Sequence, residues 1–192
     1  CALPISVIRL DSELIKSELN KKNRREKLNR LKKIGNLTFQ RITDSKIFRQ
    51  YLDQLAIDYD FRQGAMFGSE FFSEDQHKKE FMLNLFDSGL LYVTLLFSDQ
   101  TIIAANASTY DKGITYLQGF NTHHPVFAKY SPGILSFLMS ALQMQQDGLL
   151  EFDLTPGSVD DYKGDLATDF YRTWSLEAGN KTDIFKIGRA HV

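Results

Sequence analysis

The sequence has little of what marks disulfide-linked, secreted or membrane-spanning proteins. Among its 192 residues the only cysteine is Cys1, which excludes an internal disulfide framework and a thiolate metal site. No uninterrupted apolar run approaches the roughly 20 residues that span a bilayer, and no leader-like pattern opens the chain. The net charge of −1 excludes a global attraction to nucleic acid or acidic membranes. We therefore expect a cytoplasmic protein without a membrane span, in which any affinity for polyanions is local.

The stretch 131–163 carries the clearest signals of local structure. Ser131 is a favourable N-cap because its hydroxyl can accept a hydrogen bond from a first-turn amide, and Pro132 suits the first helical position. Gly148 is placed to end the helix as a C′ glycine. Between these ends, apolar residues at spacings of three and four predict an amphipathic helix: Ile134, Phe137, Leu138, Ala141, Leu142 and Met144.

A strand is predicted directly after this helix, because residues 150–154 alternate between apolar and acidic. Its acidic face carries Glu151 and Asp153. Carboxylates are costly to bury without partners, so this face meets solvent, a cation or a cleft. Lys163 is the nearby cation, and an Asp153–Lys163 ion pair is the structural alternative to a functional role for Asp153.

The chain before residue 131 reads as alternating helices and strands. In order we expect one basic helix at 11–34, a strand at 37–42, a helix from Asp44 or Ser45 to about 57, an aromatic loop at 58–72 carrying Arg62, a helix from Ser73 to about Asp87, and strands at 90–97, 102–110 and 114–120. Short polar connections make the last three strands an antiparallel meander. A closing strand is expected at 175–178.

The basic helix has two interpretations. Nine Lys and Arg residues crowd 11–34: Lys16, Lys21, Lys22, Arg24, Arg25, Lys27, Arg30, Lys32 and Lys33. They form either a solvated face or a patch for polyanions. No aromatic residue interleaves the run, which disfavours single-stranded nucleic acid as its ligand.

This order of elements resembles the second half of a GNAT-type acyltransferase. More narrowly, Tyr130-Ser131-Pro132-Gly133, followed by Asp153, Gly157 and Tyr162-Lys163, is similar to the acetyltransferase family of cellulose and exopolysaccharide biosynthesis. The resemblance covers most of the chain. The Arg/Gln-x-x-Gly-x-Gly/Ala phosphate loop of typical GNAT enzymes is absent, and Ser131-Pro132-Gly133 stands in its place.

The resemblance implies an α/β GNAT-like fold, with a mixed, mostly antiparallel sheet flanked by helices and preceded by a basic helix. It implies acetyl-CoA or another acyl-CoA as co-substrate, held at a helix N-terminus. The residues expected to bind it are Tyr130, Ser131, Gly133 and Ile134. The catalytic candidates are Asp153, Tyr162 and Lys163, and the substrate-binding candidates are Arg62, His123 and His124. No metal site is expected, because no ligand cluster has suitable spacing.

The function we expect is acyl transfer from acyl-CoA to an amine or hydroxyl of a small-molecule or saccharide acceptor. Two alternatives stay open. A Fem-type transferase has the same fold but takes its acyl group from aminoacyl-tRNA, and the basic helix would then contact RNA. The absent phosphate loop motivates the other, a non-catalytic binding module.

The domain organisation is expected to have three parts. Residues 1–36 are a basic helical arm at the end of a missing upstream lobe, since the chain opens without an initiator methionine. Residues 37–186 are the acyltransferase domain. Residues 187–192 match what a sequencing-adapter sequence encodes when translated, so we expect a non-native tail.

Overall fold

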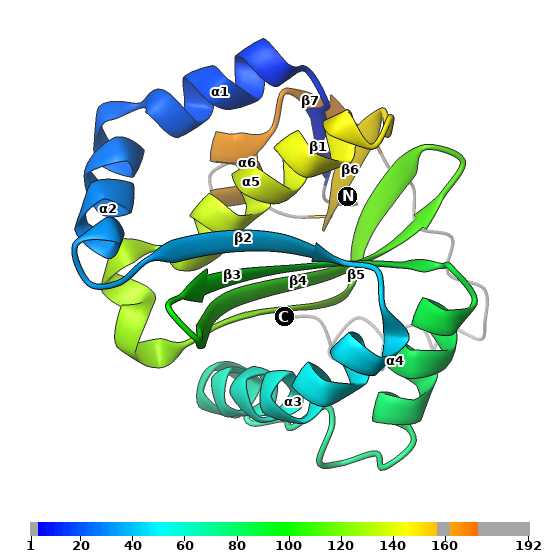
Figure 1. Ribbon diagram of the computed structural model, residues 1–192. Coiled ribbons are helices and arrows are strands. Elements are labelled where there is room, and N and C mark those ends of the chain that lie inside the picture. Colours follow the sequence, from blue (N-terminus) through cyan, green and yellow to red (C-terminus); the bar gives the residue numbers. More distant parts are fainter. Residues whose placement is uncertain (1–3, 157–161, 173–192) are drawn as a thin grey trace, which may run out of the picture.

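The computed structural model describes residues 4–156 and 162–172, and a seven-stranded sheet lies at its centre (Figure 1). The strand order is β2-β3-β4-β5-β6-β1-β7. Every neighbouring pair is antiparallel except β5 and β6, which are parallel. The strands are β1 (Ile5–Arg9), β2 (Leu37–Ile42), β3 (Leu91–Ser98), β4 (Thr101–Asp111), β5 (Ile114–His123), β6 (Glu151–Pro156) and β7 (Asp169–Tyr171). The expected mixed, mostly antiparallel sheet is confirmed.

Helices cover both faces of the sheet, with α3 and α4 on one face and α1, α2 and α5 on the other (Figure 1). Each face has its own apolar core, built on Phe48 and Leu95 under α3 and on Leu138 and Phe152 under α5. The helices are α1 (Ser12–Asn20), α2 (Lys22–Lys32), α3 (Ser45–Phe67), α4 (Lys78–Asp87), α5 (Pro132–Gln146) and α6 (Tyr162–Leu166), with a 3-10 helix η1 (Pro125–Tyr130) before α5.

The first 36 residues differ from the expected single helix. Strand β1 pairs with β6 and β7, so this segment supplies part of the sheet. The backbone becomes extended at Lys21, with φ −53° and ψ 137°, and this breaks the helix into α1 and α2. Ile15 and Leu31 are fully buried, which ties both helices to the core. The domain boundary near residue 36 stays a prediction.

The prediction of a loop at 58–72 is wrong for most of its length, because residues 58–67 are helical. Helix α3 begins after the predicted cap Asp44 but continues to Phe67 and ends at Gly68, whose φ is 70°. Buried Asp60, read as loop from the sequence, accepts hydrogen bonds from the backbone of Phe72 and from the backbone and hydroxyl of Ser73. That contact orders the following turn, and α4 therefore starts later than predicted, at Lys78.

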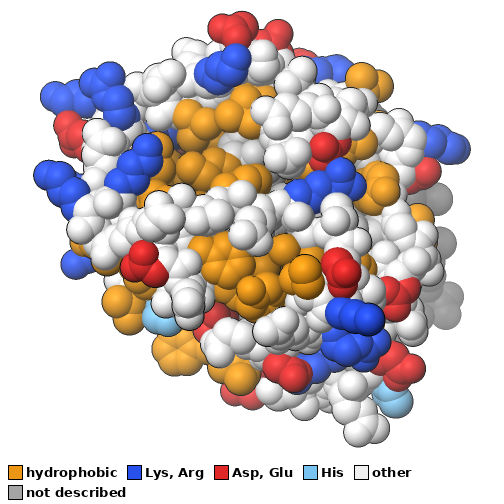
Figure 2. Space-filling model, in the orientation of Figure 1, with side chains coloured by type: hydrophobic (Ala, Val, Ile, Leu, Met, Phe, Trp, Pro, Cys, Tyr) orange, Lys and Arg blue, Asp and Glu red, His pale blue; other side chains and the backbone are white. Residues whose placement is uncertain are grey.

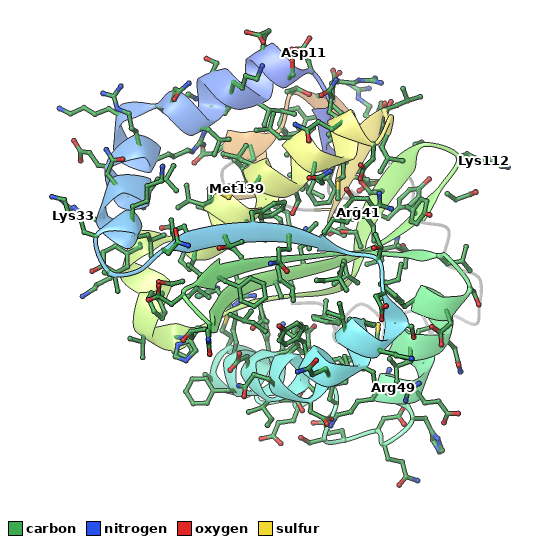
Figure 3. The ribbon with its side chains drawn as sticks, viewed as in Figure 1. Asp11, Lys33, Arg41, Arg49, Lys112 and Met139 are labelled. Carbon is green, nitrogen blue, oxygen red and sulfur yellow. The ribbon has the colours of Figure 1, made fainter. Side chains whose placement is uncertain are left out.

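Helix α5 is anchored at its C-terminal end. Asp147 accepts hydrogen bonds from Tyr92 Oη at 2.5 Å and from Arg41, and the Arg41 guanidinium lies over the Tyr92 ring (Figure 3). Burial, followed by the hydrogen bond to Asp147, raises the pKa of Tyr92. Gly148 follows with a φ of 82°, which confirms the predicted helix end. These polar contacts tie the C-terminal end of α5 to β2 and β3.

No helix in the described residues is long and apolar enough to cross a membrane. The expected strand at 175–178 and the expected tail at 187–192 lie outside the described residues.

Candidate active site

Strands β5 and β6 separate partway along their length. They pair in parallel only at Ile114 with Glu151, Thr115 with Phe152 and Tyr116 with Asp153. Strand β5 continues to His123, so among the described residues its segment 117–123 has a strand neighbour on the β4 side alone. The diverging strands leave a wedge beside segment 117–123, where one backbone oxygen, that of Asn121, accepts a hydrogen bond from Arg62.

A β-bulge lies at the start of this free segment. The register between β4 and β5 shifts between Ala107, which faces Phe120, and Thr109, which faces Tyr116. A Cβ on Gly119 would lie 2.2 Å from the carbonyl oxygen of Ala107, so the close approach of the two strands requires glycine here. Bulges change the direction of backbone groups and side chains, which suits a reaction centre.

A cavity of about 220 Å³ occupies the far end of the wedge, between the end of β5, η1 and the start of α5. Six of the predicted site residues line it: Arg62, His123, Ser131, Gly133, Ile134 and Tyr162. Its other lining residues were not predicted: Ala105, Asn121, Thr122, Ala128, Ser136 and Phe137. No sequence motif marks these residues as part of a site, and they come together only in the folded chain.

Ser131 does not cap α5 in the predicted way. It has a left-handed backbone, with φ 51° and ψ 50°, and its side chain makes no capping hydrogen bond to the helix. Its hydroxyl instead accepts a hydrogen bond from Lys27 Nζ of α2 at 2.8 Å. The first amides of α5, on Gly133 and Ile134, therefore receive no capping hydrogen bond from Ser131, and both residues line the cavity. Left-handed serine is uncommon and typical of functional turns.

His123 and Arg62 meet at the cavity wall. The Arg62 guanidinium, which comes from α3 rather than a loop, donates to the backbone and side-chain oxygens of Asn121 at 3.1 and 3.2 Å. His123 Nδ1 lies 3.7 Å from the position of a Cβ built on Gly133. Burial, and then the charge of Arg62, hold the pKa of His123 below its usual value, which favours the neutral imidazole.

His124 and Tyr130 do not line the cavity. His124 caps η1, because its Nδ1 accepts from the amide of Val126 at 3.3 Å, and its ring packs edge-on against Phe127. Tyr130 is half-buried and packs against the apolar cluster that contains Leu31 of α2, with Lys129 Nζ over its ring. Both residues shape the turn that leads into α5.

Asp153 lies at the point where β5 and β6 separate. Its carboxylate accepts from the amide of Thr155 at 2.6 Å, and Lys163 Nζ donates to the Thr155 hydroxyl at 2.8 Å. Thr155 has a φ of 67°, which is strained for a β-branched residue, so both contacts hold a strained turn. Burial raises the pKa of Asp153, and the Thr155 amide and the Lys163 charge oppose that shift.

Tyr162 lines the cavity from α6 and stacks on Phe137, with ring centroids 6.2 Å apart and nearly parallel planes. It thus forms part of the cavity wall together with Phe137. In the described part of the chain, no group of three or more His, Cys, Asp or Glu residues is placed to hold a metal ion.

Comparison with known proteins places the fold in a family. The family described as Acetyltransferase (GNAT) domain matches residues 20–164, about three quarters of the chain. The chain belongs to this family. It is therefore an acyltransferase-type domain with a GNAT-like fold, and the narrower resemblance to cellulose and exopolysaccharide biosynthesis enzymes stays a prediction. No curated protein matches the sequence significantly.

Solved structures share the fold at low sequence identity. The C-terminal domain (DUF2156) of a putative lysylphosphatidylglycerol synthetase from Agrobacterium fabrum is 16% identical, with a TM-score of 0.54 over 81% of this chain and 47% of that one. L-PGS from Bacillus licheniformis is 14% identical, with a TM-score of 0.53 over 84% and 47%. A conserved protein of unknown function from Bacteroides thetaiotaomicron is 12% identical, with a TM-score of 0.54 over 81% and 51%. The chain spans about half the length of these proteins.

Proposed function

We propose that this GNAT domain transfers an acyl group from an acyl-CoA, with acetyl-CoA as the first donor to test, to an amine or hydroxyl acceptor. The observation that carries the proposal is the wedge between β5 and β6, with the uncapped start of α5 at its open end. A helix N-terminus with free amides binds phosphate groups, because the amides donate hydrogen bonds and the helix dipole favours negative charge.

The dimensions of the wedge suit a long donor. From His123 to the bulge at Gly119 and on to Tyr116 the strand extends roughly 23 Å, at about 3.3 Å per residue. In the proposed arrangement the diphosphate binds at Gly133 and Ile134, the pantetheine arm follows the free edge of β5, and the thioester reaches the bulge. Backbone amides of the bulge then polarise the thioester carbonyl, whose oxygen becomes negative in the tetrahedral intermediate.

Asp153 is the proposed general base, because it stands beside the bulge and burial raises its pKa toward the working range. It accepts a proton from the attacking amine or hydroxyl as the new C–N or C–O bond forms. The C–S bond then breaks, and a proton from Tyr162 or solvent neutralises the CoA thiolate. Arg62, with His123 and His124, is proposed to contact the substrates rather than to transfer protons.

Transfer from aminoacyl-tRNA is the second candidate, and a charged surface favours it. Lys and Arg side chains gather over α1 and α2 (Figure 2), and exposed members are Lys21, Lys22, Arg25, Arg30, Lys32 and Lys33. A surface of this kind attracts RNA through its phosphates, and such binding weakens steeply as salt rises. Two of the similar structures are a domain of a putative lysylphosphatidylglycerol synthetase and L-PGS. Their names are the reason to test an aminoacyl donor as well.

Calorimetric titration of the purified chain with acetyl-CoA and with free CoA tests the proposal, with tRNA at two salt concentrations as the alternative ligand. We expect saturable CoA binding, followed by thiol release when an amine or sugar acceptor is added. Salt-sensitive tRNA binding without CoA binding would favour the second candidate. CoA binding without thiol release across a broad acceptor panel would favour a binding module.

A further inference from the structure

Lys27, a side chain of the N-terminal helix pair α1 and α2, contacts the turn at which α5 begins. Lys27 of α2 donates from Nζ to Ser131 Oγ at 2.8 Å, at the turn that begins α5. It also lines a smaller cavity of about 80 Å³, which shares Ser131, Ile134 and Tyr162 with the larger one. A cation from the start of the chain therefore lies where the typical phosphate loop is missing.

Among the cations from the described residues that line the smaller cavity, Lys27 is the one available to bind an anion. Arg24 also lines the smaller cavity, but it is bound to Glu18 and its charge is compensated. Asp165 lies on the same small cavity and disfavours an anion inside it. Lys27 bonds only a neutral hydroxyl in the described part of the chain, so an anion is best placed on the Ser131 side, toward the larger cavity.

Two buried hydroxyls point independently to a ligand in the larger cavity. Thr122 and Ser136 both line it and are 3% and 2% exposed. Neither Thr122 Oγ1 nor Ser136 Oγ has a hydrogen-bond partner in the described residues. Ser140, one turn further along α5, is equally buried but is bonded to Thr94 at 2.7 Å. Buried polar groups left without partners are costly, so the unpartnered pair lies where a polar ligand completes the hydrogen bonding.

We propose that Lys27 is a phosphate-binding residue of the donor site, supplied by the N-terminal helix in place of the missing loop. Its ammonium turns from Ser131 to a phosphate oxygen held by the amides of Gly133 and Ile134. This inference rests on the proposed function for the identity of the donor. The phosphate belongs either to the diphosphate of CoA or to the 3′ end of an aminoacylated RNA, and the experiment separates the two.

The test uses three variants of the whole chain. Lys27→Gln keeps a donor for Ser131 but removes the charge, and Lys27→Arg keeps the charge. Lys112→Gln is the charge-matched control, because Lys112 is an exposed residue of the turn between β4 and β5 and lies outside the basic surface over α1 and α2 (Figure 3). Affinities are measured for CoA, for pantetheine, which lacks the diphosphate, and for a short RNA ending in CCA, each at two salt concentrations.

We expect Lys27→Gln to weaken CoA binding about 10- to 100-fold, the usual loss for one charge-assisted hydrogen bond. Binding of pantetheine should stay unchanged, Lys27→Arg should retain most of the CoA affinity, and Lys112→Gln should match the wild type. The salt dependence of CoA binding should also be smaller in Lys27→Gln.

The outcomes separate this inference from the proposed function. Wild-type CoA affinity in Lys27→Gln, or an equal loss of pantetheine binding, would overturn the role of Lys27 while leaving acyl-CoA as the donor. If the wild type binds RNA but not CoA, the donor assignment fails. A loss of RNA binding in Lys27→Gln but not in Lys112→Gln would then support Lys27 as a ligand of the RNA phosphate, and wild-type RNA affinity in Lys27→Gln would refute it.

Discussion

Gly133, in the first turn of α5, and Gly148, just after the helix ends, should respond oppositely to the same substitution. A Cβ on Gly133 would meet only His123 Nδ1, at the ordinary contact distance of 3.7 Å, so Gly133→Val should change the free energy of unfolding by less than about 0.5 kcal/mol. Gly148 has a φ of 82° with open space around it. Gly148→Val should therefore cost about 1–2 kcal/mol, because a side chain is unfavourable in that conformation.

Ligand binding should show the reverse order. Three added carbons at Gly133 stand between the cavity and the first amides of α5. Losing one charge-assisted hydrogen bond to phosphate weakens affinity roughly 10- to 100-fold. Gly148 is at the opposite end of the helix, and Gly148→Val should bind CoA as the wild type does.

Thermal unfolding and calorimetric titration of CoA measure both effects on the same samples. For a domain of this size, Gly148→Val should lower Tm by roughly 2–8 °C, whereas Gly133→Val should shift it by about 2 °C or less. Unchanged CoA affinity in Gly133→Val would refute the placement of the phosphate at the start of α5. A large loss of Tm in Gly133→Val would show instead that the residue is needed for packing.

Three further predictions concern single side chains. Asp153→Asn should lower activity without lowering stability, because burial disfavours the charge of Asp153 and the asparagine amide oxygen can still accept from the Thr155 amide. Asp153→Ala should lower the free energy of unfolding, measured in urea, by about 1–2 kcal/mol, because the strained backbone of Thr155 loses this hydrogen bond. The lowered pKa of His123 means that the protein loses stability as pH falls from the ordinary histidine value of about 6.5 through the lower folded value. His123→Gln should reduce the difference in unfolding free energy between pH 7.5 and pH 5.5, and an unchanged difference would contradict the assignment. Asp60→Ala should cost about 2–4 kcal/mol, because three donors lose their acceptor, and Asp60→Asn should cost less; equal costs would show that packing rather than hydrogen bonding dominates at this site.

Local patterns predicted the middle of the chain well. The three strands of the meander, the cap at Asp44 and the helix end at Gly148 follow from side-chain alternation, capping chemistry and glycine at positive φ. These signals depend on residues close together in sequence, and tertiary contacts did not override them. The aromatic segment at 58–67 was misread because its helix is stabilised by packing against the sheet rather than by residue propensity.

The candidate site also contains residues that local sequence patterns predicted and residues that they did not. Ser131, Gly133 and Ile134 were found because a helix start has a local signature, and His123 and Arg62 proved to line the same cavity. Thr122 and Ser136 carry no such signature, because an unpartnered hydroxyl is visible only once its surroundings are folded. The roles of all these residues stay predictions.

By itself the sequence determined the alternation of helices and strands, the start of α5 and its resemblance to acyltransferases, because these depend on near neighbours. Only the tertiary structure decided that β5 and β6 diverge and that β1 joins the sheet beside β6. It also decided that Lys27, 104 residues before Ser131, draws the serine hydroxyl away from the helix it was expected to cap. Contacts between residues so distant in sequence arise from packing the whole chain, and no local pattern encodes them.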